Sequence, residues 1–391
     1  MRRLATAASA ALILTCVPAA TAAEPRPVPQ SFVGVMADGP LRTPWADSAG
    51  EMDRMVSAGV ESVRLVADWA DAQPYRSFAE VPERERSRFR DEDGVPTDYT
   101  VIDADISAAA KRHLTVLPVV YRSPGWAALH PASFTSPPRS RKTYARFVGA
   151  LARRYGSRGT FWLEHPELPA RPVRYWQIWN EPSLVEYWDE QPFARRYVDV
   201  LRSARHSLLA ADPRARVVLA GLPNFSWEDL ARIYRAGGRG LFDVVAIHPF
   251  TATVPGVVTI LERARKVMHA NGDRRLPLWV TELSWTSARG KARWTYGNET
   301  NEAGQARNLS RVYSLLARER RRLRLQRAYW YTWMSVETNP DYPFDYAGLA
   351  RMGPDGSVVL KPAFGALRRT ALRLENCARK SAVADVCSQP R

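Results

Sequence analysis

The sequence predicts an α/β fold, a (β/α)8 TIM barrel formed as a single domain with elongated loops after its strands. Short β-rich runs alternate with helical stretches along almost the whole chain. Several of these runs are continuously apolar, as strands buried on both faces should be. The alternative is a doubly wound open sheet, but no glycine-rich phosphate loop follows the first predicted strand.

Eight segments read as strands because β-branched, aromatic and other apolar residues are concentrated in them. In chain order they are 32–37, 61–69, 114–121, 173–179, 216–220, 242–247, 277–281 and 327–333. A segment with helical periodicity follows each strand. These segments are 48–57, 99–112, 143–155, 193–211, 227–236, 258–270, 302–321 and 362–372. Equal numbers of strands and helices in strict alternation indicate a closed parallel barrel.

The first 23 residues have the pattern of an export signal. A basic start at Arg2 and Arg3 precedes an apolar stretch over 4–20, and small residues around Ala22 form a cleavage pattern. The apolar stretch is too short and too rich in alanine for a membrane span. We therefore expect a secreted or extracytoplasmic protein with no integral membrane segment after signal removal.

The expected barrel domain spans 31–371, and a tail follows over 372–391. Cys377 and Cys387 both lie in this tail. In an oxidising compartment they could close a short loop as a disulfide. The alternative is a pair of tail thiols with no partner.

The net charge is +16 and comes mostly from arginine. Such a charge could bind an acidic polysaccharide or another anionic surface. The interpretation we favour is a biased composition that spreads arginine over helix surfaces. We expect no nucleic-acid partner, because no recognition module is visible.

Polar and aromatic side chains stand where the predicted strands end, and the carboxyl ends of barrel strands meet at one mouth. These residues are Asp38, Arg64, Tyr121, Asn180, Glu181, His248, Glu282 and Trp333. Glu181 follows Trp179, and Glu282 lies close to Trp285, so both carboxyl groups should lie in a shielded cleft. Two carboxyl groups that face each other across one bond are what cleavage of a glycosidic bond requires.

The motif Asn180-Glu181-Pro182 after the fourth strand, with Glu282 at the end of the seventh, resembles the retaining barrel glycoside hydrolases of clan A. The stretch Tyr121-Arg-Ser-Pro-Gly-Trp-Ala127 and the motif His248-Pro-Phe250 are most similar to glycoside hydrolase family 39. The family 5 cellulase-like enzymes come next. The resemblance covers about residues 31–371. Phe250 departs from the pattern, because a tyrosine often stands there, so another group must hold the nucleophile.

The resemblance implies a retaining O-glycoside hydrolase that cleaves β-linked carbohydrate by double displacement. Glu181 would be the acid/base, with a raised pKa, and Glu282 the nucleophile. A non-catalytic carbohydrate-binding or wall-associated barrel and a transglycosylase with the same site are the alternatives. The sequence leaves the sugar and the linkage open.

Five further residues are predicted to bind the substrate or to position the glutamates. Arg64 and His248 would hold the nucleophile, and Asn180 would bond the sugar 2-hydroxyl. Trp333 would form an apolar floor under that sugar, and Tyr121 would contact the ligand. Four of them also have a structural alternative, which is core packing for Trp333 and Tyr121, bonding of loop backbone for His248 and a charge pair with Asp38 or Asp68 for Arg64.

We expect no metal and no cofactor, because the histidines are scattered and no metal-binding motif is present. Long segments at 73–98, 123–142 and 335–346 follow the second, third and eighth strands and should form the walls of the cleft. Candidates for further sugar platforms are Trp126, Trp188, Trp285 and Trp294.

Overall fold

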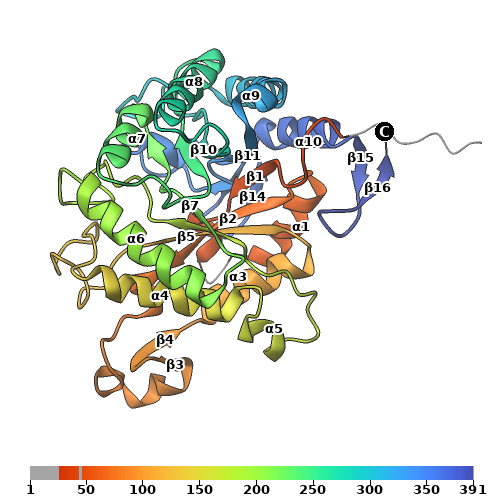
Figure 1. Ribbon diagram of the computed structural model, residues 1–391. Helices are drawn as coiled ribbons and strands as arrows, with labels where there is room; N and C mark the ends of the chain where they lie inside the picture. Colours follow the sequence, from red (N-terminus) through yellow and green to blue (C-terminus); the bar gives the residue numbers. More distant parts are fainter. Residues whose placement is uncertain (1–25, 44–45, 391) are drawn as a thin grey trace, which may run out of the picture.

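The computed structural model describes residues 26–43 and 46–390, so the predicted signal segment lies outside the described residues. Helices surround a central curled sheet (Figure 1). Its nine strands are all paired in parallel, in the order β7-β6-β5-β2-β1-β11-β10-β9-β8. Their bounds are β1 Val33–Met36, β2 Ser62–Asp68, β5 Thr115–Tyr121, β6 Tyr175–Ile178, β7 Arg216–Val218, β8 Leu222–Pro223, β9 Val245–His248, β10 Leu278–Leu283 and β11 Leu325–Trp330.

The sheet closes on itself, because its two outer strands, β7 and β8, are halves of one interrupted segment. Val218 at the end of β7 forms a parallel bridge with Val244, which directly precedes β9. The Leu219 N–H donates to the Val244 carbonyl at 3.0 Å, and Leu222 pairs with Ile247 farther along. Taken as one strand, β7 and β8 form the fifth of eight. The predicted (β/α)8 barrel is therefore confirmed.

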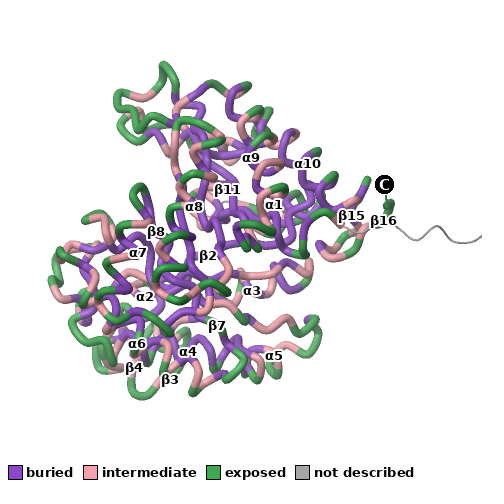
Figure 2. Tube along the Cα trace, turned by 45° about the horizontal axis from the view of Figure 1, so that its top comes forward, coloured by how far each residue is buried: buried purple, intermediate pink, exposed green. Residues whose placement is uncertain are grey.

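Four of the eight helices around the barrel begin where a side chain caps the first turn. Asp47, Ser140, Thr253 and Asn301 each accept a hydrogen bond from a backbone N–H three residues on. The eight helices are α1 Ser48–Ser57, α3 Thr100–Lys111, α4 Arg141–Tyr155, α6 Ala194–Ala211, α7 Ser226–Arg235, α8 Val254–Ala270, α9 Glu302–Leu323 and α10 Pro362–Leu374. Figure 2 shows buried residues throughout the centre of the molecule and exposed residues on the loops and outer helix faces.

The structure also contains several short strands and helices, outside the barrel elements, that were not predicted. The strands among them are β3 Phe89–Glu92 and β4 Val95–Asp98, which pair as a hairpin, and β12 Met334–Ser335, β13 Ala350–Met352 and β14 Val358–Leu360, which form a small sheet. The helices are α2 Trp69–Ala72, α5 Thr160–Glu164 and the 3-10 turns η1 Gly39–Arg42, η2 Phe78–Glu80, η3 Glu83–Arg88 and η4 Pro343–Tyr346. None of the described helices combines the length and the apolar composition of a membrane span.

The tail forms a hairpin of β15 (Cys377–Lys380) and β16 (Cys387–Pro390), in which a disulfide joins Cys377 to Cys387. This hairpin contacts the amino-terminal end of the barrel strands. The buried Lys380 ammonium donates to Glu61, which directly precedes β2, at 2.9 Å, and lies 2.5 Å from Glu375. The tail is therefore part of the packed structure.

Candidate active site

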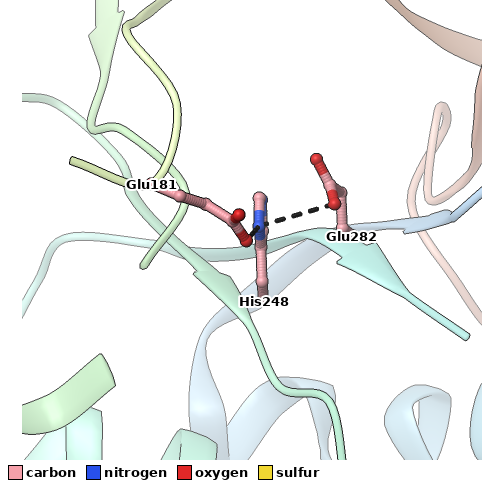
Figure 3. Close-up of side chains that lie close together, drawn as sticks. All are labelled: Glu181, His248 and Glu282. Atoms are coloured by element: carbon pink, nitrogen blue, oxygen red, sulfur yellow. Dashed lines mark hydrogen bonds and ion pairs between the residues drawn. The ribbon is translucent and has the colours of Figure 1, made fainter. Parts of the chain in front are cut away.

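Three strand ends bring Glu181, His248 and Glu282 together at the mouth of the barrel (Figure 3). Glu181 follows β6, His248 ends β9 and Glu282 lies in β10. The two carboxyl groups lie on either side of the His248 ring, whose Nδ1 is 2.6 Å from Glu181 Oε1 and 3.6 Å from Glu282 Oε2. One oxygen of each carboxyl group lies within 4.8 Å of the other. Two acids thus face one small space.

Left-handed backbone at the end of β6 aims Glu181 into this space. Trp179 has a φ of 69° and Glu181 a φ of 39°, in a backbone region that residues other than glycine rarely adopt. Two hydrogen bonds hold the turn: the Trp179 N–H donates to the Val120 carbonyl at 2.9 Å, and the Glu181 N–H donates to the Gly221 carbonyl at 3.1 Å. Such conformations cost about 1–3 kcal/mol each and persist where neighbours impose them.

Gly221 makes room for the histidine. A methyl group on its Cα would lie 1.9 Å from His248 Nε2, closer than any real contact. Gly221 stands in the interruption between β7 and β8, where its carbonyl is free to accept from Glu181. Gly221 therefore leaves room for the His248 ring and positions Glu181 through its carbonyl.

Arg64, in β2, holds the second glutamate. Its guanidinium is 1% exposed and donates to Glu282 Oε1 at 2.6 Å and to Asn180 Oδ1 at 2.8 Å. The alternative pairing with Asp38 or Asp68 is not observed, since Asp38 accepts from a threonine hydroxyl and Asp68 pairs with another arginine. Arg64 therefore forms its ion pair with Glu282.

His248 is fully buried, and burial lowers its pKa to about 4. The imidazole is therefore neutral at physiological pH. Its Nε2 lies 2.9 Å from the Thr281 hydroxyl, which fits an Nε2–H donor. Nδ1 is then the acceptor, and a protonated Glu181 donates to it. The sequence placed His248 beside the nucleophile, but its short hydrogen bond is to Glu181.

The two glutamates differ in their electrostatic surroundings. Burial raises the pKa of Glu181 to about 8, with the Arg64 charge opposing and the Glu186 carboxylate adding to the shift. Burial also raises the pKa of Glu282, and His248 and Arg64 oppose that shift. Because Arg64 bonds Glu282 directly, the ionised form is favoured there. The site thus holds its proton on Glu181.

A cavity of about 350 Å³ opens above the pair, within the range of small-molecule sites. Its lining includes Glu181, Leu184, Glu186, Tyr187, Pro223, Asn224, Phe250, Glu282, Tyr296, Asn298, Tyr331, Tyr342 and Phe344. A second cavity of about 180 Å³ adjoins it. Lining this one are Tyr121, Arg122, Phe134, Thr135, Trp179, Glu186 and Tyr187. The two cavities share Glu186 and Tyr187, so they form one cleft.

The structure corrects the predicted role of Trp333. Its side chain is fully buried, its Nε1 donates to Glu51 of α1 at 2.8 Å, and its ring meets Phe364 of α10 edge-on. The ring therefore packs between the barrel and the helices instead of under a sugar. The strand ends at Trp330, before the predicted 333, and the chain then brings Tyr331 to the cavity. Tyr331, and not Trp333, therefore lines the cavity that holds the two glutamates.

The four other tryptophans that were predicted as sugar platforms differ in burial. Trp188 and Trp285 are buried, Trp126 is half-buried with its Nε1 donating to the Gln73 carbonyl, and Trp294 is 64% exposed. Sequence reasoning missed the aromatic residues that do line the larger cavity. They are Tyr187, Tyr296, Tyr331, Tyr342 and Phe344.

Of the three predicted wall segments, two line the cleft. Segment 123–142 contributes Phe134 and Thr135 to the smaller cavity, and 335–346 contributes Tyr342 and Phe344 to the larger. Segment 73–98 contributes to neither; it folds into the 3-10 turns η2 and η3 and the β3–β4 hairpin.

Among the described residues, Glu181, His248 and Glu282 are also the group whose ligand atoms approach closely enough to surround a metal ion. The Arg64 guanidinium, 2.6 Å from Glu282 Oε1, opposes a second cation at this point. The donor set therefore fits proton transfer better than metal binding.

No family model matches the chain, and no curated protein matches it significantly. Solved structures do resemble it. The chain is similar to a monomeric β-xylosidase from Caulobacter crescentus CB15, with 18% identity and a TM-score of 0.56 over 88% of this chain and 69% of that one. It is similar to the GH39 enzyme from Xanthomonas axonopodis pv. citri, with 18% identity and a TM-score of 0.56 over 90% and 71%.

An α-L-arabinofuranosidase from Thermotoga maritima also resembles the chain, with 14% identity and a TM-score of 0.58 over 90% of this chain and 72% of that one. At such identities the likeness concerns the fold. The predicted resemblance to barrel glycoside hydrolases is confirmed at that level, and family 39 enzymes are among the structures that the chain resembles. The chain has the fold of these barrel glycoside hydrolases.

Proposed function

We propose that this protein is an exported retaining O-glycoside hydrolase that cleaves β-glycosidic bonds by double displacement. The observation that carries the proposal is the pair of buried glutamates whose carboxyl oxygens approach within 4.8 Å. Retaining enzymes hold their carboxyl groups about 5–5.5 Å apart, and inverting enzymes about 6.5–9.5 Å apart. The short separation favours retention, because it leaves no room for a water molecule between an inverting base and the sugar.

The proton and charge arrangement matches the two steps of that mechanism. In the first step the protonated Glu181 gives its proton to the leaving oxygen, while the Glu282 carboxylate attacks the anomeric carbon and forms a glycosyl ester. In the second step Glu181, now ionised, takes a proton from water. The resulting attack by that water on the anomeric carbon releases Glu282 and restores the resting state.

Two neighbouring residues would support these steps. Arg64 binds Asn180 through Oδ1, so the Asn180 amide N–H group is available to donate to the sugar 2-hydroxyl. That contact strengthens as positive charge develops at the anomeric carbon. In the resting state His248 accepts a hydrogen bond from the protonated Glu181 and so orients the acid. Arg64, which donates to Glu282 Oε1 at 2.6 Å, takes the place of the tyrosine hydroxyl that Phe250 lacks.

Export rests on two features of the chain. The pattern over 1–23 is that of a secretory signal. The Cys377–Cys387 disulfide is a bond that persists in oxidising compartments.

The proposal is tested with a panel of aryl β-glycosides and neutral glycans, using the wild type and Glu282→Ala. We expect turnover by the wild type with the β-anomer released first, as seen by proton NMR, and a loss of about 10⁴-fold in the variant. Release of the inverted anomer, or near wild-type rates in the variant, would refute double displacement. Transfer to an added acceptor sugar in place of water would identify a transglycosylase.

The pH dependence provides a second test. The pKa of Glu181 is about 8, so the fraction of enzyme with a protonated acid falls above that pH. We expect kcat/KM to fall about tenfold per pH unit on the alkaline side. Substrates whose leaving group needs no proton should lose this limb, because their cleavage does not require the acid.

A further inference from the structure

We infer that the cleft binds a segment of an uncharged polysaccharide, with sugar units in both cavities. The inference rests on the proposed function and names its substrate class.

The cleft does not share the strong positive charge of the whole protein. The net charge is +16, yet the described residues that line the larger cavity include three glutamates and no lysine, arginine or histidine. Among the described residues that line the smaller cavity Arg122 is the one basic residue, and Asp68 neutralises it at 2.5 Å. A polymer of acidic sugars would meet the Glu186 and Glu282 carboxylates and no unpaired cation among these lining residues, so a neutral one is favoured.

The exposed aromatic rings of the described chain all lie on loops at the barrel mouth. They are Phe134 at 82%, Phe225 at 64%, Trp294 at 64%, Tyr296 at 62% and Tyr342 at 39% exposure. These loops follow β5, β8, β10 and β11. Exposed aromatic surface that gathers on one face marks a binding site, and flat rings match the apolar faces of sugar rings.

Aromatic residues line both cavities of the cleft. In the larger cavity Tyr331 contacts Phe344 at 5.8 Å between ring centroids, and Phe344 stacks with Tyr296 at 5.5 Å. In the smaller cavity Tyr187 contacts Tyr121 at 6.2 Å, and Phe134 lines the same space. Both catalytic glutamates line the larger cavity, so sugar units that occupy both cavities extend beyond the catalytic pair, which favours a chain over a single sugar.

The backbone beside Phe134 is anchored although its ring is exposed. The next residue, Thr135, accepts a hydrogen bond through its carbonyl from the Asp189 N–H at 3.1 Å. The Asp189 side chain in turn pairs with His130 at 3.0 Å. A ring on an anchored backbone loses less conformational freedom on binding than one on a free loop, so its contact contributes more to affinity.

The first test measures the effect of substrate length. Aryl glycosides of one to six units, built from a sugar that the wild type hydrolyses, are compared on Phe134→Ala, Tyr296→Ala and their double variant. Leu163→Ala is the matched control, since Leu163 is 79% exposed on α5, which precedes β6 on the opposite side of the barrel. We expect a three- to tenfold loss of kcat/KM per ring on the long substrates and less than twofold on the shortest. Equal effects at every length, or none, would overturn the inference.

The second test measures binding without turnover. Glu282→Ala is run in gels that contain xylan, mixed-linkage β-glucan or galactan, and in gels that contain polygalacturonate or alginate. Retardation by a neutral polymer, reduced by the added Phe134→Ala change, supports the inference. Retardation by the acidic polymers alone, or by no polymer, contradicts it. A wild type that hydrolyses nothing in the panel of aryl glycosides and glycans, yet binds a neutral polymer through Phe134, would refute the proposed function and leave this inference standing.

Discussion

The two ends of the barrel each hold a buried glutamate whose pKa is raised to about 8. At the mouth this residue is Glu181, and burial is the main cause of its shift. At the opposite end it is Glu375, whose shift comes from burial and from the neighbouring Glu61 charge. A raised pKa by itself therefore does not identify a catalytic acid.

The two residues differ in their access to a cavity and in the charged groups beside them. Glu181 lines a cavity and faces a second carboxyl group across His248. Glu375 instead lies 2.5 Å from the buried Lys380 ammonium of the tail hairpin. The mouth keeps its acid next to space for a substrate, whereas the other end uses a similar acid to attach the tail.

The largest expected difference is in activity. Glu181→Gln removes the proton donor and should lower kcat/KM by about 10²–10⁴-fold, while Glu375→Gln should leave it within about twofold. Both variants keep the volume and polarity of the side chain, so steady-state assays on one substrate compare them directly. Comparable losses in the two variants would mean that the two ends are coupled and that our distinction is wrong.

A smaller loss should follow from a change near the histidine. Gly221→Ala places a methyl group where His248 Nε2 stands and should displace the ring, with a loss of about 10²-fold in kcat. Gly125→Ala is the matched control in a loop at the mouth, because the nearest atom to its added methyl is 3.4 Å away. If Gly221→Ala retained wild-type kcat, His248 would have no part in orienting the acid.

At the other end of the barrel we expect an effect on stability without an effect on activity. Replacing Cys377 and Cys387 with serine opens a loop with a sequence separation of 10 residues and should lower the free energy of unfolding by about 2–3 kcal/mol. Urea unfolding measures this loss, and kcat at 25 °C should not change. A parallel loss of kcat would show that the tail reaches the mouth.

The smallest effect concerns the corrected aromatic residue. Trp333→Phe removes the hydrogen bond to Glu51 and should lower the free energy of unfolding by about 1–2 kcal/mol with KM unchanged. Tyr331→Ala, in contrast, should raise KM, because Tyr331 lines the cavity. A raised KM in Trp333→Phe would restore the sequence-based role of Trp333.

The barrel and the two glutamates could be predicted because each depends on local pattern. Alternation sets the fold, and the strand ends place Glu181 and Glu282 at one mouth. The place of Tyr331 in the lining of the cavity could not be predicted, because the last strand ends at Trp330 and regular alternation of side chains stops there. The partner of His248 could not be predicted either, because it depends on how the Gly221 carbonyl positions Glu181.

Three aromatic residues that line the cleft could not be predicted for a related reason. Tyr296, Phe344 and Phe134 lie in loops, where no period of two or 3.6 residues tells which side chains turn toward the cleft. The sequence showed long segments after some strands but gave no means to select the rings within them.

The interruption of the fifth strand has a consequence for thermal behaviour. Between β7 and β8 the Ala220 N–H is bonded to the Tyr197 hydroxyl instead of to a neighbouring strand. β2 and β5, in contrast, pair without a break from Ser62 to Asp68. On warming, amide hydrogens of Leu219 and Val244 should therefore exchange with deuterium before those of β2. Because Gly221 anchors Glu181, catalysis should be lost reversibly a few degrees below the melting temperature.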